Sequence, residues 1–292
     1  MPILSSELIT NDDGSIFHLH LLPEHLADHI ILVGDPGRVA LIASFFDHIE
    51  LERSNREFYT VTGNYKNRRI SVISTGIGPD NIDIVINELD ALANIDLKTK
   101  QIKPEKKSLN IVRIGTSGSV QADIPVDSFV ISEKSIGCDG VLRFYADHEN
   151  ITDREFEEAF IEQCDWTKSA ARPYVVNASA QLVKKLHTEG RTLKGVTLTA
   201  VGFYGPQGRV LRLPLAMPGI NDRITAFRYD RFKVTNYEME SAAITGLCNL
   251  LGHQAATICL IIANRMTGDA SADYHGYMQK LIRYTLEQLS RQ

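Results

Sequence analysis

Short apolar runs alternate with amphipathic segments along the chain. Residues 29–34 (HIILVG), 109–114 (LNIVRI) and 255–263 are almost wholly apolar, which is typical of buried strands. Residues 78–94 instead repeat apolar side chains every three or four positions, which is typical of a helix with one buried face. This alternation predicts an α/β fold in which a central, mixed, twisted sheet is flanked by helices.

The same patterns predict the other elements. Strands are expected at residues 57–62, 69–74, 126–136, 196–201 and 234–238, and helices at 38–46, 179–187, 240–250 and 274–289. Gly63-Asn64 is the expected turn of a hairpin between the first two of these strands. The chain shows no internal repeat, so residues 1–292 are expected to form a single domain.

One polar stretch breaks the alternation. Residues 97–108 (LKTKQIKPEKKS) contain five lysines and Pro104. The stretch is either a basic docking surface or a solvated loop inserted between a helix and a strand. We favour the surface loop, because charged connections are usually solvated.

Composition narrows the class of protein. The 292 residues include 31 Lys+Arg and 36 Asp+Glu, which gives a formal net charge of −5. A slightly acidic chain is not expected to bind nucleic acid, although a few arginines can still hold a small anion. The start of the chain lacks the features of a signal peptide, and no apolar run is long enough for a membrane span. Four dispersed cysteines without a CxxC motif predict reduced core residues of a cytoplasmic protein.

Candidate chemistry gathers where strands end. In GDPGR (34–38), glycines before a helix can bring backbone N–H groups to an anion, and Arg38 would then complement the anion. In RIGTSG (113–118), Arg113 lies inside an apolar strand, where a charge is costly unless it is paired. For Arg38 the alternative is a surface arginine beside an ordinary turn, and for Arg113 it is a structural salt bridge. The turn TGIGP (75–79) is weaker evidence of the same kind.

Two further segments carry polar groups that could bind a small ligand. Gln207 and Arg209 can clamp a planar amide-like edge, with Phe203 stacked on the ring, although a plain polar loop is also possible. Glu238 and Glu240 can accept hydrogen bonds from vicinal hydroxyls, or they can simply favour the start of a helix.

Together these segments resemble the nucleoside phosphorylase family, over about residues 17–269 and in the same order. The matching segments are FHL (17–19), GDPGR (34–38), SNREF (54–58), STGIG (74–78), RIGTSG (113–118), FYGPQGR (203–209), EMES (238–241) and NR (264–265). The resemblance implies the phosphorylase/hydrolase-like single-domain fold.

The resemblance also implies roles for individual residues. Phosphate would be bound by Gly34, Arg38, Arg113, Thr116 and Arg56 of the partner subunit. The ribose would be bound by Glu238, Met239, Glu240 and the partner subunit's His18. The base would be bound by Phe203, Gln207 and Arg209, with Arg265 behind them. The catalytic set would be Arg38, Arg113, Thr116, Gln207, Arg209 and Glu240.

The implied reaction is the reversible phosphorolysis of uridine, with inversion, to uracil and ribose 1-phosphate in pyrimidine salvage. Purine-specific relatives carry an aspartate at the position of Asn264, and nucleosidase relatives lack the full set of arginines. The alternatives are a purine nucleoside phosphorylase, a nucleoside hydrolase, or a nucleoside-binding protein without catalysis.

The resemblance further implies a homodimer as the smallest functional unit, with hexamers built from three dimers in related enzymes. No cofactor is expected beyond phosphate as co-substrate, and no metal, because the histidines lack ligand spacing. A monovalent cation near Glu57 is allowed by the resemblance but not expected. His253 is expected in a surface turn, and residues 266–275 in a flap over the base.

Overall fold

The computed structural model describes residues 2–291. The strands are β1 His29–Val33, β2 His48–Asn55, β3 Phe58–Tyr65, β4 Arg68–Ser74, β5 Ile95–Asp96, β6 Gln101–Ile102, β7 Asn110–Ser119, β8 Phe129–Gly137, β9 Tyr174–Asn177, β10 Leu193–Thr199, β11 Val234–Glu238 and β12 Gln254–Asn264. The α-helices are α1 Pro36–Ala43, α2 Pro79–Asn94, α3 Arg154–Gln163, α4 Ala180–Leu186, α5 Ile220–Ala226, α6 Ser241–Leu251 and α7 Tyr274–Ser290. Short 3₁₀ helices cover Pro23–His25, Val141–Phe144, His148–Asn150 and Gly205–Gln207.

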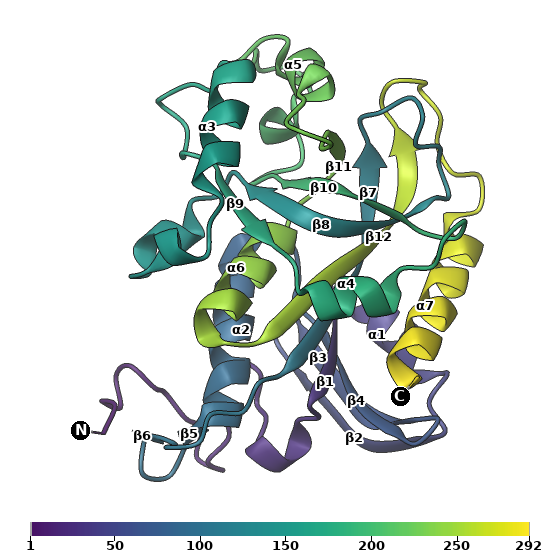
Figure 1. Ribbon diagram of the computed structural model, residues 1–292. Coiled ribbons are helices and arrows are strands. Elements are labelled where there is room, and N and C mark those ends of the chain that lie inside the picture. The colour runs from purple at the N-terminus through teal and green to yellow at the C-terminus, as the bar shows by residue number, and fades with distance from the viewer. Residues whose placement is uncertain (1, 292) are drawn as a thin grey trace.

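One mixed sheet runs through the molecule in the order β11-β10-β8-β12-β7-β1-β4-β3-β2 (Figure 1). Strands β4, β1, β7 and β12 are mutually parallel, β8 is antiparallel to β12, and β10 and β11 are parallel to β8 and to each other. β11 also pairs with β7, so the strands β7, β12, β8, β10 and β11 form a closed ring. The prediction of a mixed α/β sheet is confirmed.

Helices cover both faces of the sheet, as the apolar central strands require. In β1, Ile30 and Leu32 pack with the cluster that holds α2 and α6, whereas Ile31 and Val33 pack with α1, α4 and α7. Strands buried on both faces read as continuous apolar runs, which explains why this segment was recognisable in the sequence.

The hairpin register differs from the prediction. Its turn is Lys66-Asn67, with φ of 47° and 63°, not Gly63-Asn64. Two left-handed residues are what a tight two-residue hairpin needs. Gly63 lies inside β3, where a Cβ would overlap the backbone oxygen of His48 on β2. The prediction also missed β2, β9 and α5.

The lysine-rich stretch folds back as the small β5–β6 pair. Lys100 donates to the backbone oxygen of Leu8, Lys103 to that of Ala93, both at 2.8 Å, and Lys107 lies 2.5 Å from Asp28. Three of the five ammonium groups in this stretch are therefore bound by the chain itself.

His253 is buried, so the prediction of a surface turn residue was wrong. Gly252 ends α6 in the left-handed conformation and turns the chain directly into β12. His253 is therefore carried into the core, where Nδ1 accepts from the backbone N–H of Leu109 at 3.2 Å and Nε2 lies 3.3 Å from Asp90.

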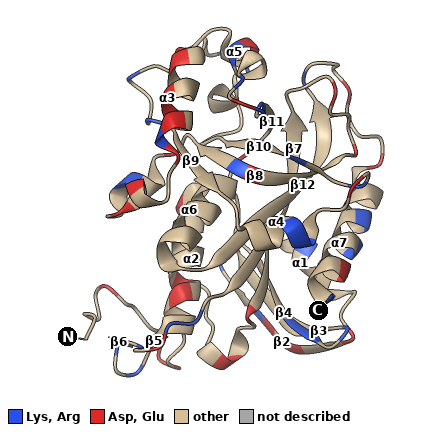
Figure 2. Ribbon diagram, viewed as in Figure 1, with Lys and Arg blue, Asp and Glu red and all other residues tan. Residues whose placement is uncertain are grey.

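The structure also bears on the predictions that were made from the cysteines, the charge and the hydrophobicity of the chain. Cys138, Cys164, Cys248 and Cys259 are all free and buried, as expected. Acidic and basic residues are mixed over the helices, strand edges and loops (Figure 2). Within residues 2–291, no helix has the length and apolar character needed to cross a membrane, and no group of three or more acidic, histidine or cysteine side chains is arranged to hold a metal ion.

Candidate active site

Two groups of polar side chains lie where the parallel strands end. The arginine–glutamate cluster consists of Arg38, Arg113, Glu238 and Glu240. The glutamine–arginine cluster consists of Gln207, Arg209 and Arg265. Both belong to the sets predicted from the sequence, and the structure brings the members of each together.

Arg113 is the centre of the first cluster. Its guanidinium contacts the carboxylate of Glu240 directly and lies 3.3 Å from Oε2 of Glu238. Only 5% of Arg113 is exposed. Burial opposes the charge, but Glu240 and Glu238 more than compensate and raise the pKa of Arg113. A structural ion pair is therefore present, and it lies among the residues expected to bind ligand.

The structure explains why a glycine stands two positions after Arg113. β7 does not end at Gly115 as predicted but continues to Ser119, so Gly115 lies inside the strand beneath the Arg113 side chain. A Cβ at position 115 would overlap the guanidinium and come within 3.0 Å of Cys259 Sγ. The glycine is needed for close approach of a side chain, not for a loop.

The carboxylate of Glu240 retains capacity for a ligand. Oε1 accepts from the backbone N–H of Gly78 at 2.9 Å, and the other oxygen contacts Arg113. Burial raises the pKa of Glu240, and Arg113 opposes that shift. A carboxylate offers about four acceptor positions, so Glu240 can accept further hydrogen bonds without releasing either partner.

The carboxylate of Glu238 is more fully occupied. Oε1 accepts from the hydroxyl of Thr199 at 2.5 Å. Oε2 accepts from the backbone N–H groups of Glu240 and Ser241, both at 2.9 Å, besides its contact with Arg113. These donors use the acceptor positions of Glu238 inside the protein.

Arg38 adds a second positive charge beside Arg113. Asp35 caps α1 by accepting from the N–H of Gly37 at 2.8 Å, and Arg38 follows in the first turn. Its guanidinium donates to the backbone oxygen of Ile114 at 3.3 Å. Burial, then repulsion by Arg113, lowers the pKa of Arg38. Two guanidiniums that repel each other in a half-buried site are suited to an anion.

Two other residues predicted for the anion lie at the same strand ends. Gly34 follows β1, and a Cβ there would lie 3.3 Å from the backbone oxygen of Gly76. Thr116 is half-buried on β7. Met239 is half-buried between the two glutamates.

In the glutamine–arginine cluster, two guanidiniums converge on one amide oxygen. Oε1 of Gln207 accepts from Arg209 at 2.6 Å and from Arg265 at 2.5 Å, and Gln207 is only 3% exposed. Burial lowers the pKa of Arg209, and burial with repulsion by Arg209 lowers that of Arg265 to about 10. Among residues 2–291, neither arginine forms a salt bridge.

Aromatic rings support both arginines. The guanidinium of Arg209 lies 3.9 Å from the ring centre of Phe203, which is half-exposed. Arg265 lies 4.5 Å from the ring centre of Tyr237. Such cation–π contacts stabilise a guanidinium that lacks a carboxylate.

β7 and β11 join the two clusters. Arg113 is on β7, and a Cβ at Gly118 further along that strand would lie 3.6 Å from Nε of Arg265. On β11, Tyr237 is paired with Gly118 and precedes Glu238. The two clusters therefore lie along the same pair of strands.

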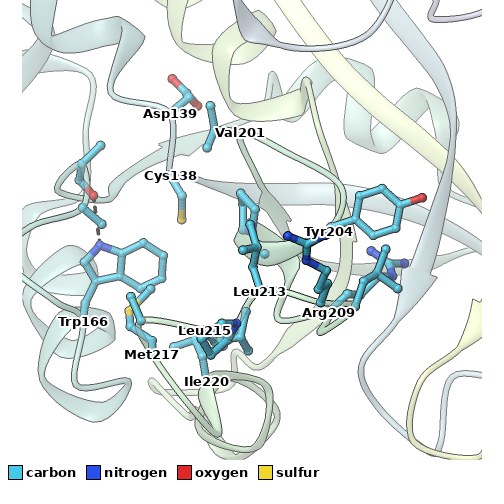
Figure 3. Close-up of a pocket in the computed structure, with 18 residues that line it drawn as sticks. Cys138, Asp139, Trp166, Val201, Tyr204, Arg209, Leu213, Leu215, Met217 and Ile220 are labelled. Carbon is cyan, nitrogen blue, oxygen red and sulfur yellow. Dashed lines mark hydrogen bonds between the residues drawn. The ribbon is translucent and has the colours of Figure 1, made fainter.

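A cavity of about 710 Å³ adjoins the second cluster. Arg209 and Tyr204 lie on one side of it, and Cys138, Asp139 and Trp166 lie across from them (Figure 3). The rest is lined largely by apolar side chains of residues 211–217. None of the arginine–glutamate cluster lines this cavity, so it extends from the glutamine–arginine end only.

Asn264 does not present its amide to either cluster. Nδ2 donates to the backbone oxygens of Gln121 and Ile124 at 3.0 and 2.9 Å, and Oδ1 accepts from the N–H groups of Met266 and Thr267. The amide of Asn264 holds two loops together, and the polar groups that can select a base are those of the glutamine–arginine cluster.

His18 and Arg56 form a separate group. Arg56 is exposed and lies 5.6 Å from the ring centre of Phe17, while Nδ1 of His18 lies 2.6 Å from Glu88. Among the described side chains, neither residue forms a hydrogen bond or ion pair with the two clusters. This placement is compatible with the prediction that both residues act in a neighbouring subunit's site.

The sequence prediction did not include Thr199 or Tyr237. Thr199 ends an apolar strand and Tyr237 precedes Glu238-Met239-Glu240, but neither has a spacing that distinguishes it from an ordinary strand residue. Only the pairing of β10 with β11 and of β11 with β7 reveals their contacts.

Comparison with known proteins gives consistent matches. A model of the phosphorylase superfamily matches residues 28–287. Uridine phosphorylase of Thermococcus kodakarensis is 28% identical over 274 residues, which are 91% of this chain and 83% of the relative. A DeoD-type purine nucleoside phosphorylase of Oceanobacillus iheyensis is 26% identical over 86% of this chain and 88% of its own. The crystal structure of a Trypanosoma brucei nucleoside phosphorylase, described as showing uridine phosphorylase activity, is 30% identical with a TM-score of 0.87, covering 97% of this chain and 99% of the other.

Proposed function

This chain belongs to the phosphorylase superfamily, and from that premise we propose that it is a uridine phosphorylase. It is then a pentosyltransferase that converts uridine and inorganic phosphate into uracil and ribose 1-phosphate, reversibly and in pyrimidine salvage in the cytoplasm. The observation that carries the choice of base is the pair of guanidiniums that converge on Gln207 without a carboxylate.

A pyrimidine fits this cluster chemically. The edge of uracil carries carbonyl acceptors on either side of an N–H donor. The amide nitrogen of Gln207 and N–H groups of Arg209 can donate to those carbonyl oxygens, while Oε1 of Gln207 holds the two guanidiniums in place. When the glycosidic bond breaks, the departing uracil gains negative charge. The positive charge of Arg209 and Arg265 is already in place to stabilise that charge in the transition state.

At the other end, phosphate binds between Arg38 and Arg113, beside Gly34 and Thr116. A phosphate oxygen attacks C1′ of the ribose with inversion as the bond from C1′ to the base nitrogen breaks, and the bonding electrons leave with uracil. Glu240 accepts hydrogen bonds from the ribose hydroxyls and fixes the sugar for attack. Met239 lies against the ribose. Glu238 was also expected to bind the ribose, but its oxygens already accept from Thr199, Glu240 and Ser241 and contact Arg113, so we assign it to holding Arg113 and Glu240 instead. No residue forms a covalent intermediate, and no metal or other cofactor takes part.

The smallest active unit in this proposal is a homodimer. Arg56 of the partner subunit completes the phosphate site, and the partner subunit's His18 binds the 5′-hydroxyl. The grouping of these two residues away from both clusters supports the assignment.

The decisive experiment measures uracil release from uridine with and without phosphate, with inosine and thymidine alongside. We expect release from uridine only when phosphate is present, with ribose 1-phosphate as co-product. Phosphate-independent release indicates a hydrolase, release of base from inosine alone indicates a purine phosphorylase, and uridine binding without product indicates a binding protein.

A further inference from the structure

Thr199 lies at the end of β10 beside Glu238, which ends the parallel strand β11. Thr199 is fully buried, and its hydroxyl lies between two partners. It donates to Oε1 of Glu238 at 2.5 Å and accepts from the backbone N–H of Ala242, in the first turn of α6, at 2.9 Å. The hydroxyl hydrogen therefore has one orientation, toward the carboxylate.

Through Glu238, this hydroxyl is connected to the groups that carry the proposed chemistry. The second oxygen of Glu238 holds the backbone N–H groups of Glu240 and Ser241 and lies 3.3 Å from Arg113. One carboxylate thus fixes both the start of α6, from which Glu240 projects, and one edge of the Arg113 guanidinium. Thr199 supplies the donor on its other oxygen.

From this geometry we propose that Thr199 is a positioning residue, which acts through Glu238 to hold Arg113 and Glu240 in their active arrangement. The inference rests on the proposed function, because it assigns Thr199 to the same site. Thr199 touches neither the phosphate nor the nucleoside in this assignment. Without its hydroxyl, Glu238 loses one strong charge-assisted hydrogen bond and can rotate away from Arg113 and the start of α6.

The chain offers a matched control two residues earlier on the same strand. Thr197 is also fully buried, and its hydroxyl bonds to Ser132 at 2.6 Å and to Asn236 at 3.1 Å. These partners belong to the core of the sheet and do not contact the arginine–glutamate cluster. Thr197→Val therefore removes a comparable buried hydroxyl without the connection to the site.

The test compares Thr199→Val, Thr199→Ser and Thr197→Val by steady-state kinetics, thermal melting and calorimetric titration with inorganic phosphate. For Thr199→Val, we expect kcat to fall about 10²-fold, the size of effect expected when reacting groups are misplaced by about 1 Å. Affinity for phosphate should fall about tenfold, the equivalent of one net hydrogen bond to Arg113.

Thr199→Ser keeps the hydroxyl and should restore kcat to within about threefold of the wild type, since its donor and acceptor roles are the same. Thr197→Val should lower the melting temperature as much as Thr199→Val but retain both kcat and phosphate affinity. An unchanged kcat in Thr199→Val, an equal loss in Thr197→Val, or a failure of Thr199→Ser to recover would each overturn the inference.

The same experiment separates this inference from the proposed function. If the wild type binds phosphate but releases no uracil, the proposed function fails while phosphate affinity still tests Thr199. If the wild type is active and the three variants do not differ in kcat or phosphate affinity, the role of Thr199 fails and the proposed function stands. A wild type with neither phosphate binding nor activity overturns both.

Discussion

The two clusters handle positive charge in opposite ways. In the arginine–glutamate cluster, Arg113 is buried against two carboxylates that come from the end of β11 and the start of α6. In the glutamine–arginine cluster, Arg209 and Arg265 share only a neutral amide oxygen. The first cluster is built on strand ends, and the second takes two of its three members from a loop whose Leu211 and Leu213 are 75% and 77% exposed.

This difference separates stability from binding. In the first cluster, carboxylates largely balance the guanidiniums. Its ion pairs therefore stabilise the fold, and its arginines also bind the ligand. The second has positive charge without a counter-ion in the described part of the chain, so a ligand with anionic character completes it. Substitutions that remove a charge from the first cluster should therefore lower stability and activity together. In the second cluster the two properties should separate, because a group that lowers activity there need not lower stability.

The largest expected effect is that of Arg113→Ala. It leaves Glu238 and Glu240 buried without their cation, and breaking such a buried pair typically costs about 3–5 kcal/mol of unfolding free energy. Phosphorolysis should also fall about 10³-fold, the upper range for loss of one preorganised donor. Denaturant melts and kcat/KM measure the two effects. The control is Arg191→Ala, because Arg191 is exposed and precedes β10, at the opposite end of that strand from Thr199. A stable Arg113→Ala protein would contradict the coupling of fold and site.

Gln207→Glu supplies the missing carboxylate and sharpens the comparison. Two charge-assisted hydrogen bonds should raise the free energy of unfolding by about 1 kcal/mol. The same charge cancels the field that stabilises departing uracil, so kcat should fall about 10²-fold. Thermal melting tests the expected gain in stability, and steady-state kinetics test the expected fall in kcat.

The neutral variant Gln207→Met separates the charge from the loss of the amide. It should slow the reaction without the gain in stability. Activity of Gln207→Glu at the wild-type level would show that the positive charge at this end is not used in the reaction.

Gly115→Ala should have an intermediate effect. Its methyl group displaces the Arg113 guanidinium from both carboxylates, and we expect about a tenfold loss of kcat/KM with a measurable fall in melting temperature. Gly205→Ala in the loop of the other cluster is the matched variant, because its Cβ meets only Leu215 at 3.9 Å. Equal losses in the two variants would argue against the specific role of Gly115.

The smallest expected effect is that of Leu213→Ser. Its side chain is 77% exposed, so the unfolding free energy should stay within about 0.5 kcal/mol of the wild type. Leu198→Ala, on buried β10, should cost about 2–5 kcal/mol under the same denaturant titration. A large loss in Leu213→Ser would show that the loop contributes to the core after all.

Much of the fold was predictable because its central strands are buried on both faces. β1, β12 and the first half of β7 appear as apolar runs, and α2 and α7 as helices with one apolar face. β2 was missed because most of its residues are exposed, and its alternation lacks an apolar face. The hairpin turn was misplaced because glycine marks a turn in sequence, whereas Gly63 is required by the close approach of β2.

By itself, the sequence determined which residue types end the strands: arginines, glutamates and an amide within glycine-containing motifs. It could not determine their partners. Arg113 and Glu240 are 127 residues apart in the sequence, and Thr199 and Glu238 are 39 apart. His253 is buried because α6 ends directly before β12, and only the packing of β12 into the sheet places that end in the core. Local periodicity is encoded by neighbouring residues, but these contacts depend on which strands lie side by side, and the tertiary structure alone decides that.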